Sequence, residues 1–117
     1  MGRASEAIAF RDRLEALAAA SPPAGAALAW AAGLLAPSAQ DAHRMLSDAA
    51  KQLEALGQII DLGRCLTDLA EVEIRLGRDA SPSLTRARQI FDASGAVLFI
   101  HEVEGVERLT IRGTLRT

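Results

Sequence analysis

A repeat of about 38 residues is the feature of this sequence that most constrains its fold. Shifting the chain by 38 residues places segment 44–57 on segment 82–95, and the segments before them also correspond. The matched pairs are Leu28 with Leu66, Ala32 with Ala70, Leu34 with Val72, Leu46 with Leu84, Ala49 with Ala87, Leu53 with Phe91 and Gly57 with Gly95. Repeats of this length are typical of helix pairs that stack into a solenoid.

The apolar spacing within each repeat is helical. Apolar residues recur at steps of three and four, prolines stand where helices can begin, and Gly57, Gly77 and Gly95 follow the periodic runs as C-terminal caps. Ser38 and Ser81 are candidate N-caps. The pattern predicts helices over 5–20, 23–35, 38–56, 58–76, 82–94 and 96–109, with a short strand as the alternative for the AVLFI segment at the start of the last one.

The composition supports helices and argues against β folds. The 117 residues include 24 alanines and 16 leucines, and Ala and Leu lead the helix-propensity scale, whereas the strand-forming aromatic residues are scarce. Half of the residues are hydrophobic, which argues against disorder. We therefore expect an all-α fold of about six helices, in antiparallel pairs stacked as a short solenoid, over residues 1–109, with a tail over 110–117.

Small residues in the helices indicate close helix packing. Ala49 and Ala87 occupy the same repeat position, with the larger Leu53 and Phe91 four residues later. Glycine inside a helix costs about 0.5–1 kcal/mol relative to alanine. Gly33 and Gly63 therefore predict places where two helices cross closely, although codon bias also accounts for part of the alanine content.

The charge distribution excludes several classes of partner. The net charge is −2, and each half of the chain is near −1, so neither half has the basic excess of a nucleic-acid or membrane-surface module. Cys65 is the only cysteine, which excludes an internal disulfide and favours a reduced, cytoplasmic setting. The uncharged run 16–40 resembles a signal-peptide core, but acidic residues precede it and prolines divide it, so we expect no membrane association.

The second helices of the repeats resemble the tetratricopeptide motif. Ala42, Leu46 and Ala49, and more loosely Leu84, Ala87 and Phe91, stand where that motif places its small and large residues. Residues 5–104 are similar to the degenerate repeats of LuxR-type and ATPase-linked bacterial transcription regulators. The period near 38, the lack of tyrosine and the lack of a proline at the repeat end depart from the standard motif.

This resemblance implies a partner-binding groove on the first helices of the pairs. The residues that it would place there are Trp30, Arg64, Asp68, Glu71 and Glu102. For Trp30 a position in the core is the alternative, because large aromatic side chains are mostly buried. The resemblance implies a non-catalytic protein-interaction or regulatory module that associates with itself or with another domain, or, as the alternative, a repeat segment that senses a small molecule.

The residues that could carry chemistry have simpler structural interpretations. No phosphate-binding glycine loop, nucleophile elbow or zinc-protease motif is present in the sequence. We interpret Cys65 as a buried apolar residue rather than a nucleophile, and His101 with Glu104 as a surface pair rather than metal ligands. The cluster of Arg75, Arg78, Arg86 and Arg88 either binds an anion or is solvated surface. We therefore expect no enzyme activity, cofactor or metal, with a helical-bundle enzyme as the third alternative.

Overall fold

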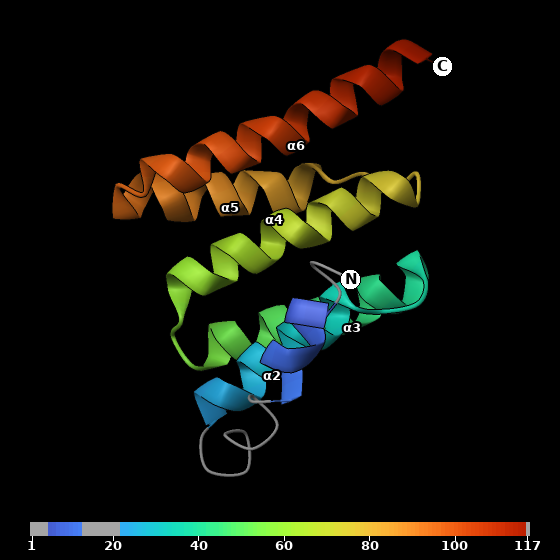
Figure 1. Ribbon diagram of the computed structural model, residues 1–117. Coiled ribbons are helices and arrows are strands. Elements are labelled where there is room, and N and C mark those ends of the chain that lie inside the picture. The colour runs from blue at the N-terminus through green and yellow to red at the C-terminus, as the bar shows by residue number, and fades with distance from the viewer. Residues whose placement is uncertain (1–4, 13–21, 117) are drawn as a thin grey trace. The chain divides into compact units, whose positions relative to one another are not determined.

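All secondary-structure elements in the part of the chain that the structure describes are α-helices. A computed structural model describes the backbone of residues 5–12 and 22–116 and the side chains of 5–12 and 24–110. Residues 5–12 are helical, followed by α2 (Pro22–Leu34), α3 (Ala39–Ala55), α4 (Ile59–Arg75), α5 (Ser81–Ser94) and α6 (Val97–Arg116) (Figure 1). The all-α prediction with about six helices is confirmed, and the AVLFI segment belongs to the start of α6 rather than to a strand.

The predicted glycine caps are confirmed. Gly57, Gly77 and Gly95 have φ values of 71°, 71° and 69°, in the left-handed region where glycine is favoured. Each is followed by a residue whose backbone N–H reaches back five positions, as in the bond from Ala96 N to Phe91 O at 3.0 Å. The three helices α3, α4 and α5 therefore end in the same Schellman-type turn.

The helix starts match the prediction at α3 but not at α5. Ser38 is the N-cap of α3, and its hydroxyl accepts a hydrogen bond of 3.1 Å from Asp41 N. At α5 the N-cap is Ala80, which lacks a side-chain acceptor, and Ser81 is the first helical residue. The acceptor is supplied one residue earlier, because the Asp79 carboxylate accepts from Ser81 N at 2.9 Å. The prediction of Ser81 as the N-cap is therefore wrong.

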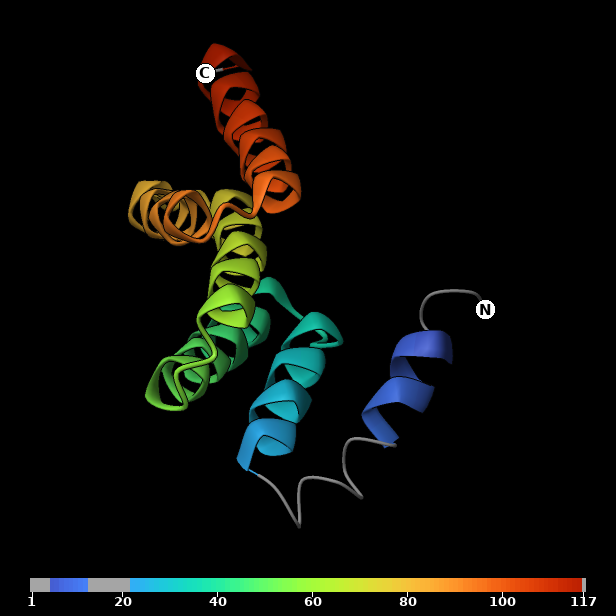
Figure 2. The same ribbon diagram turned by 90° about the vertical axis from the view of Figure 1, so that its left-hand side faces the viewer.

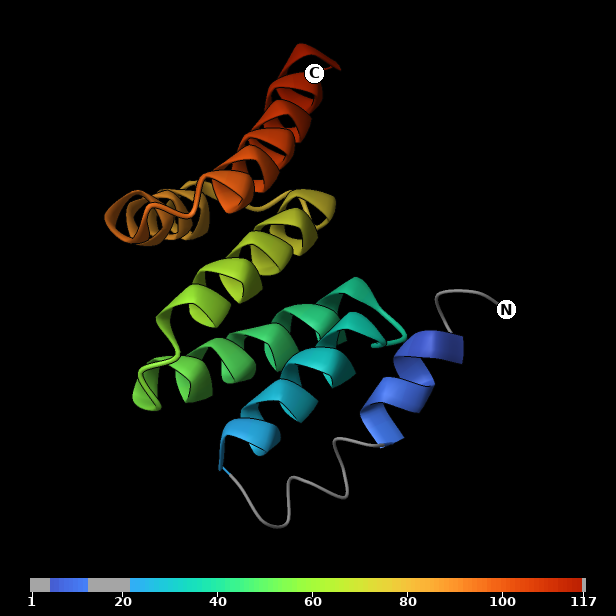
Figure 3. The same cartoon turned by 60° about the vertical axis from the view of Figure 1, so that its left-hand side comes forward.

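The chain divides into two compact units, Met1–Gln58 and Ile59–Thr117. In the first unit α2 and α3 pack side by side as a helix pair (Figure 3). The two helices lie close together at Gly33, where an added Cβ would lie 2.7 Å from Leu46 Cδ2. The predicted close crossing at this glycine is confirmed. The buried apolar residues of the pair are Ala26, Ala31, Ala42, Leu46, Ala49, Ala50 and Leu53.

The second unit is a helix pair with one further helix. α4 packs against α5, and α6 packs against both. Gly63 repeats the role of Gly33, because a Cβ there would lie 2.7 Å from Phe91 Cε1. The Phe91 ring also lies against Phe99 of α6, with ring centroids 5.3 Å apart. Phe91 is fully buried and therefore joins all three helices.

Helix α6 continues beyond the predicted boundary. Its backbone is helical through Arg116, including the residues that the sequence assigned to a tail from 110. The segment contains no proline, and its single Gly113 costs only about 1 kcal/mol in a helix, which is too little to end one. Figures 1 and 2 show that α6 diverges from α5 toward its C-terminal end.

Candidate functional site

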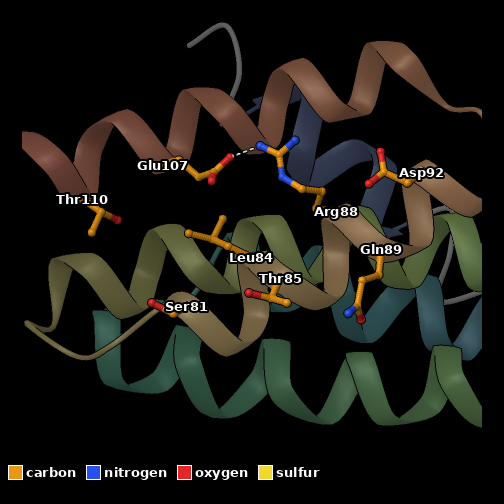
Figure 4. Close-up of a pocket in the computed structure, with 8 residues that line it drawn as sticks. All are labelled: Ser81, Leu84, Thr85, Arg88, Gln89, Asp92, Glu107 and Thr110. Atoms are coloured by element: carbon orange, nitrogen blue, oxygen red, sulfur yellow. Dashed lines mark hydrogen bonds and ion pairs between the residues drawn. The ribbon is translucent and has the colours of Figure 1, made fainter.

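A pocket of about 360 Å³ lies between α5 and α6 (Figure 4). It arises where the two helices diverge. Helix α5 supplies one face at helical spacing and α6 supplies the opposite side; the lining residues are Ser81, Leu84, Thr85, Arg88, Gln89, Asp92, Glu107 and Thr110. Its volume is at the lower end of the range for small-molecule sites, about 300–1,000 Å³.

An ion pair between Arg88 and Glu107 crosses the pocket from α5 to α6 (Figure 4). The hydrogen bond to Glu107 is the main cause that raises the pKa of Arg88, and Glu107, Glu104 and Asp92 add electrostatic attraction. The guanidinium therefore lies among three carboxylates. Both partners are about 40% exposed, so water screens the pair and it contributes little to stability.

The accessible lining of the pocket is mostly apolar, with polar side chains around it. Leu84 is buried, whereas Thr85 and Gln89 are exposed on the neighbouring turns of α5. This arrangement can hold a small ligand by hydroxyl, amide and carboxylate groups around one aliphatic contact. The signal in the sequence was the polar spacing of Ser81, Thr85, Gln89 and Asp92, but any solvated helix face shows the same spacing, so sequence reasoning did not find the pocket.

The predicted groove residues are divided between the two units. Trp30 is half-buried on α2 of the first unit, and the other four belong to the second unit. Arg64, Asp68 and Glu71 follow one another at steps of four and three on α4, which places them on one helix face. Glu102 is exposed on α6.

Contacts inside the second unit hold the groove residues Arg64 and Glu71. The Arg64 guanidinium lies 5.0 Å from the centre of the Phe99 ring on α6, and its Nη1 is 3.8 Å from Asp61. Glu71 pairs with Arg75 at 3.2 Å, one helical turn later. A ligand in a groove at α4 would therefore compete with these contacts. The stacking of Arg64 on Phe99 was not anticipated from the sequence.

Cys65 has the environment of a structural residue. Its side chain is fully buried in α4. Burial, with a smaller electrostatic contribution from Asp68, raises the pKa of the thiol to about 12. The thiolate needed for nucleophilic chemistry is therefore disfavoured at neutral pH. The interpretation of Cys65 as a buried apolar residue is confirmed.

The remaining candidates form surface pairs. His101 Nδ1 lies 3.6 Å from Glu104, and no group of three or more metal-ligating side chains occurs among residues 5–12 and 24–110. In the arginine cluster, Arg75 and Arg88 pair with Glu71 and Glu107. No helix in the described ranges combines the length and apolar character needed to cross a bilayer.

Comparison of the chain with family models, with curated proteins and with solved structures gives no match.

Proposed function

We propose that this protein is a non-catalytic helical-repeat module of the cytoplasm that binds a protein partner, either a second copy of itself or another domain. The observation that carries the proposal is the repetition of one packing unit. Ala49 and Leu53 of α3, and Ala87 and Phe91 of α5, are all buried at positions 38 residues apart. Repeated helix pairs with this construction form extended surfaces that bind other proteins.

Exposed apolar side chains give a second reason for the proposal. Leu98 is 80% exposed and Leu34 is 59% exposed, although each lies in or at the end of a well-formed helix. Single exposed apolar residues are common, but such side chains stabilise a complex when a partner covers them. The resemblance to tetratricopeptide-like repeats of bacterial regulators supports the same proposal.

Sedimentation velocity of the purified full chain over a range of concentrations tests this function. A sedimentation coefficient that rises with concentration supports self-association. A chain that stays monomeric at every concentration contradicts self-association, and then the partner, if the module has one, is a different protein.

The α5–α6 pocket favours a second candidate function, the sensing of a small polar molecule. A thermal-shift screen against sugars and nucleotides tests it, because a ligand at 100 times its Kd stabilises the folded state by about 2.7 kcal/mol. Gln89→Trp fills the pocket, and Lys51→Trp changes the corresponding exposed position of α3 as the control. A ligand of the pocket loses its shift in the first variant and keeps it in the second. A screen without any shift contradicts this candidate.

The same screen can test the groove at α4. A partner or ligand bound there would contact Arg64 in place of the Phe99 ring. The variant Arg64→Ala removes that contact and is therefore expected to weaken binding. Arg44→Ala is a suitable control, because Arg44 is also exposed and also makes an i,i+3 ion pair, with Asp41. Equal effects of the two variants on binding would contradict a groove at α4.

A further inference from the structure

One exposed face of α6 carries a stripe of four residues. None of them lines the pocket, and only Glu102 belongs to the predicted groove. Leu98, Glu102, Gly105 and Leu109 follow one another at steps of four, three and four, which keeps them on one side of the helix. Leu98 is 80% exposed and Leu109 is 38% exposed. The buried Val103 lies away from the stripe, and the buried Val106 flanks it, four residues after Glu102; both face the rest of the unit.

The spacing of this α6 stripe reads the same in both directions. If a second α6 runs antiparallel across the first, a two-fold axis between Glu102 and Gly105 brings Leu98 of each copy to Leu109 of the other. The same axis brings Glu102 of each copy to Gly105 of the other. A two-fold dimer needs such a self-complementary surface, because one patch must contact itself.

Gly105 leaves room for this approach. A Cβ added there would have a single neighbour within 4 Å, Arg108 Nη2 at 3.7 Å. The side chain of Glu102 from a second copy can therefore lie over the glycine without a clash. The Arg108 guanidinium lies beside that position, so the arriving carboxylate meets a positive charge.

The charges at the α6 stripe are available for such a contact. Among the described residues, neither Glu102 nor Arg108 is paired with an opposite charge, whereas Glu104 on the next face contacts His101 at 3.6 Å. A dimer would form two equivalent Glu102–Arg108 pairs across the axis. Opposite charges in register fix the orientation of two helices and exclude the competing parallel arrangement, in which like charges face each other.

We propose that the α6 stripe is a homodimer interface in which the α6 helices of two copies cross antiparallel about Gly105. The inference rests on the proposed function and names the surface by which the module associates with itself. Because four positions per helix make a small interface, the dimer belongs to the weak class, with a Kd between about 10 μM and 1 mM.

Leu98→Glu is the first test, with Val97→Glu as the matched control. Val97 precedes Leu98, is 59% exposed and lies about a quarter-turn from the nearest residue of the stripe. Both variants therefore add one charge at the start of the same helix. Sedimentation velocity of the full chain is expected to show a dimer Kd at least about tenfold higher for Leu98→Glu and nearly unchanged for Val97→Glu. Far-UV circular dichroism checks that both variants fold.

Charge reversal tests the orientation. Glu102→Arg and Arg108→Glu each place like charges across the axis and are expected to raise the Kd severalfold. The double variant restores opposite charges and is expected to return the Kd toward that of the unmodified protein. Single reversals without effect, or a double variant weaker than either, would overturn the antiparallel contact.

Cross-linking provides an independent readout of the register. Leu98→Cys and Leu109→Cys variants, one carrying a size tag, are mixed and oxidised with diamide. The antiparallel stripe predicts that the mixed disulfide between positions 98 and 109 predominates over either homodimer. Cys65 contributes little background, because its side chain is buried. Predominance of the 98–98 homodimer would overturn the proposal.

The outcomes separate this inference from the proposed function. Association that persists in Leu98→Glu places the interface elsewhere, so the inference fails while self-association stands. A monomer at all concentrations up to about 1 mM overturns both the α6 interface and self-association.

Discussion

The two helix pairs have the same repeat period but different cores. Among the described residues, five of the seven buried apolar side chains in the first unit are alanine, and the other two are leucine. In the second unit three of twelve are alanine, and the rest are larger. The first pair therefore depends on close approach of its backbones, whereas the second depends on the volume of its side chains.

This difference shows that the repeat preserves geometry rather than core volume. Leu53 and Phe91 occupy equivalent positions, and each fills the space beside a buried alanine. Each CH₂ group buried contributes about 0.8 kcal/mol. We therefore expect the second unit to be the more stable of the two.

The largest effect is expected for truncation at the large repeat position. Phe91→Ala should lower the free energy of unfolding by about 3–5 kcal/mol, because the fully buried ring contacts Phe99 and the Gly63 backbone. Leu53→Ala in the first unit should cost about 2–5 kcal/mol. Urea unfolding followed by circular dichroism measures both. A loss below about 1 kcal/mol for Phe91→Ala would contradict its role in joining three helices.

Replacing Gly33 or Gly63 by alanine should lower the free energy of unfolding by a smaller amount, about 1–3 kcal/mol each. The new Cβ would meet Leu46 in Gly33→Ala and the Phe91 ring in Gly63→Ala, each at 2.7 Å. Gly25→Ala is the control, because nothing lies within 4 Å of its Cβ position and alanine favours the helix by up to about 1 kcal/mol. Thermal unfolding of the three variants measures the effects. Stabilisation in all three would mean that neither crossing is close.

A polar contact joins the two helices of the second pair at positions that are apolar in the first pair. The Ser83 hydroxyl on α5 donates a hydrogen bond of 2.7 Å to the Glu73 carboxylate on α4. The corresponding positions of the first unit are Met45 and Leu35. Ser83→Ala should lower the free energy of unfolding by about 0.5–1.5 kcal/mol. Denaturant titration measures the loss, and an unchanged midpoint would show that water replaces this hydrogen bond at no cost.

The smallest effect is expected for the pH dependence of stability, which comes from the carboxylate at the start of α5. Hydrogen bonds from the Ser81 hydroxyl and backbone N–H lower the pKa of Asp79 below 3.8. Because the folded pKa is the lower one, Asp79 stabilises α5 fully above about pH 4, and this contribution is lost as the pH falls through the folded pKa. At the start of α3 in the first unit, the acceptor is the hydroxyl of Ser38, which does not titrate in this range.

Melting temperatures at about pH 6 and pH 2.5 test this difference. Asp79→Asn should reduce the decrease in melting temperature between the two values, whereas Ser38→Ala should lower the melting temperature equally at both. An identical pH dependence in Asp79→Asn and the unmodified protein would contradict the carboxylate cap.

The sequence predicted the local structure well, because each feature has a local cause. The left-handed turns follow from glycine at the end of an apolar period, and the close crossings follow from Gly33 and Gly63 inside helices. The N-cap of α5 was misplaced by one residue, because the acceptor is the Asp79 carboxylate rather than a side chain of the N-cap, and the nearby Ser81 resembled a cap. The end of α6 was missed, because one glycine weakens a helix without terminating it.

The site was less predictable, because it depends on how helices diverge. The pocket exists where α5 and α6 separate, and no periodicity encodes the angle between two helices. The Arg88–Glu107 pair joins residues 19 positions apart, beyond the range of helical spacing rules. The groove assigned from the tetratricopeptide resemblance stays a prediction, although the contact of Arg64 with Phe99 now gives it a specific test.

The identical turns at Gly57 and Gly95 have a consequence for how this protein can be modified. In both, the residue after the glycine donates to the carbonyl five positions earlier, at 3.0 Å. The segment 58–95 therefore begins directly after one of these turns and ends at the glycine of the other. A tandem copy of this cassette, inserted after Gly95, would meet each neighbour through a turn that the chain already makes. We therefore expect the junctions of such an insertion to form with no new linker.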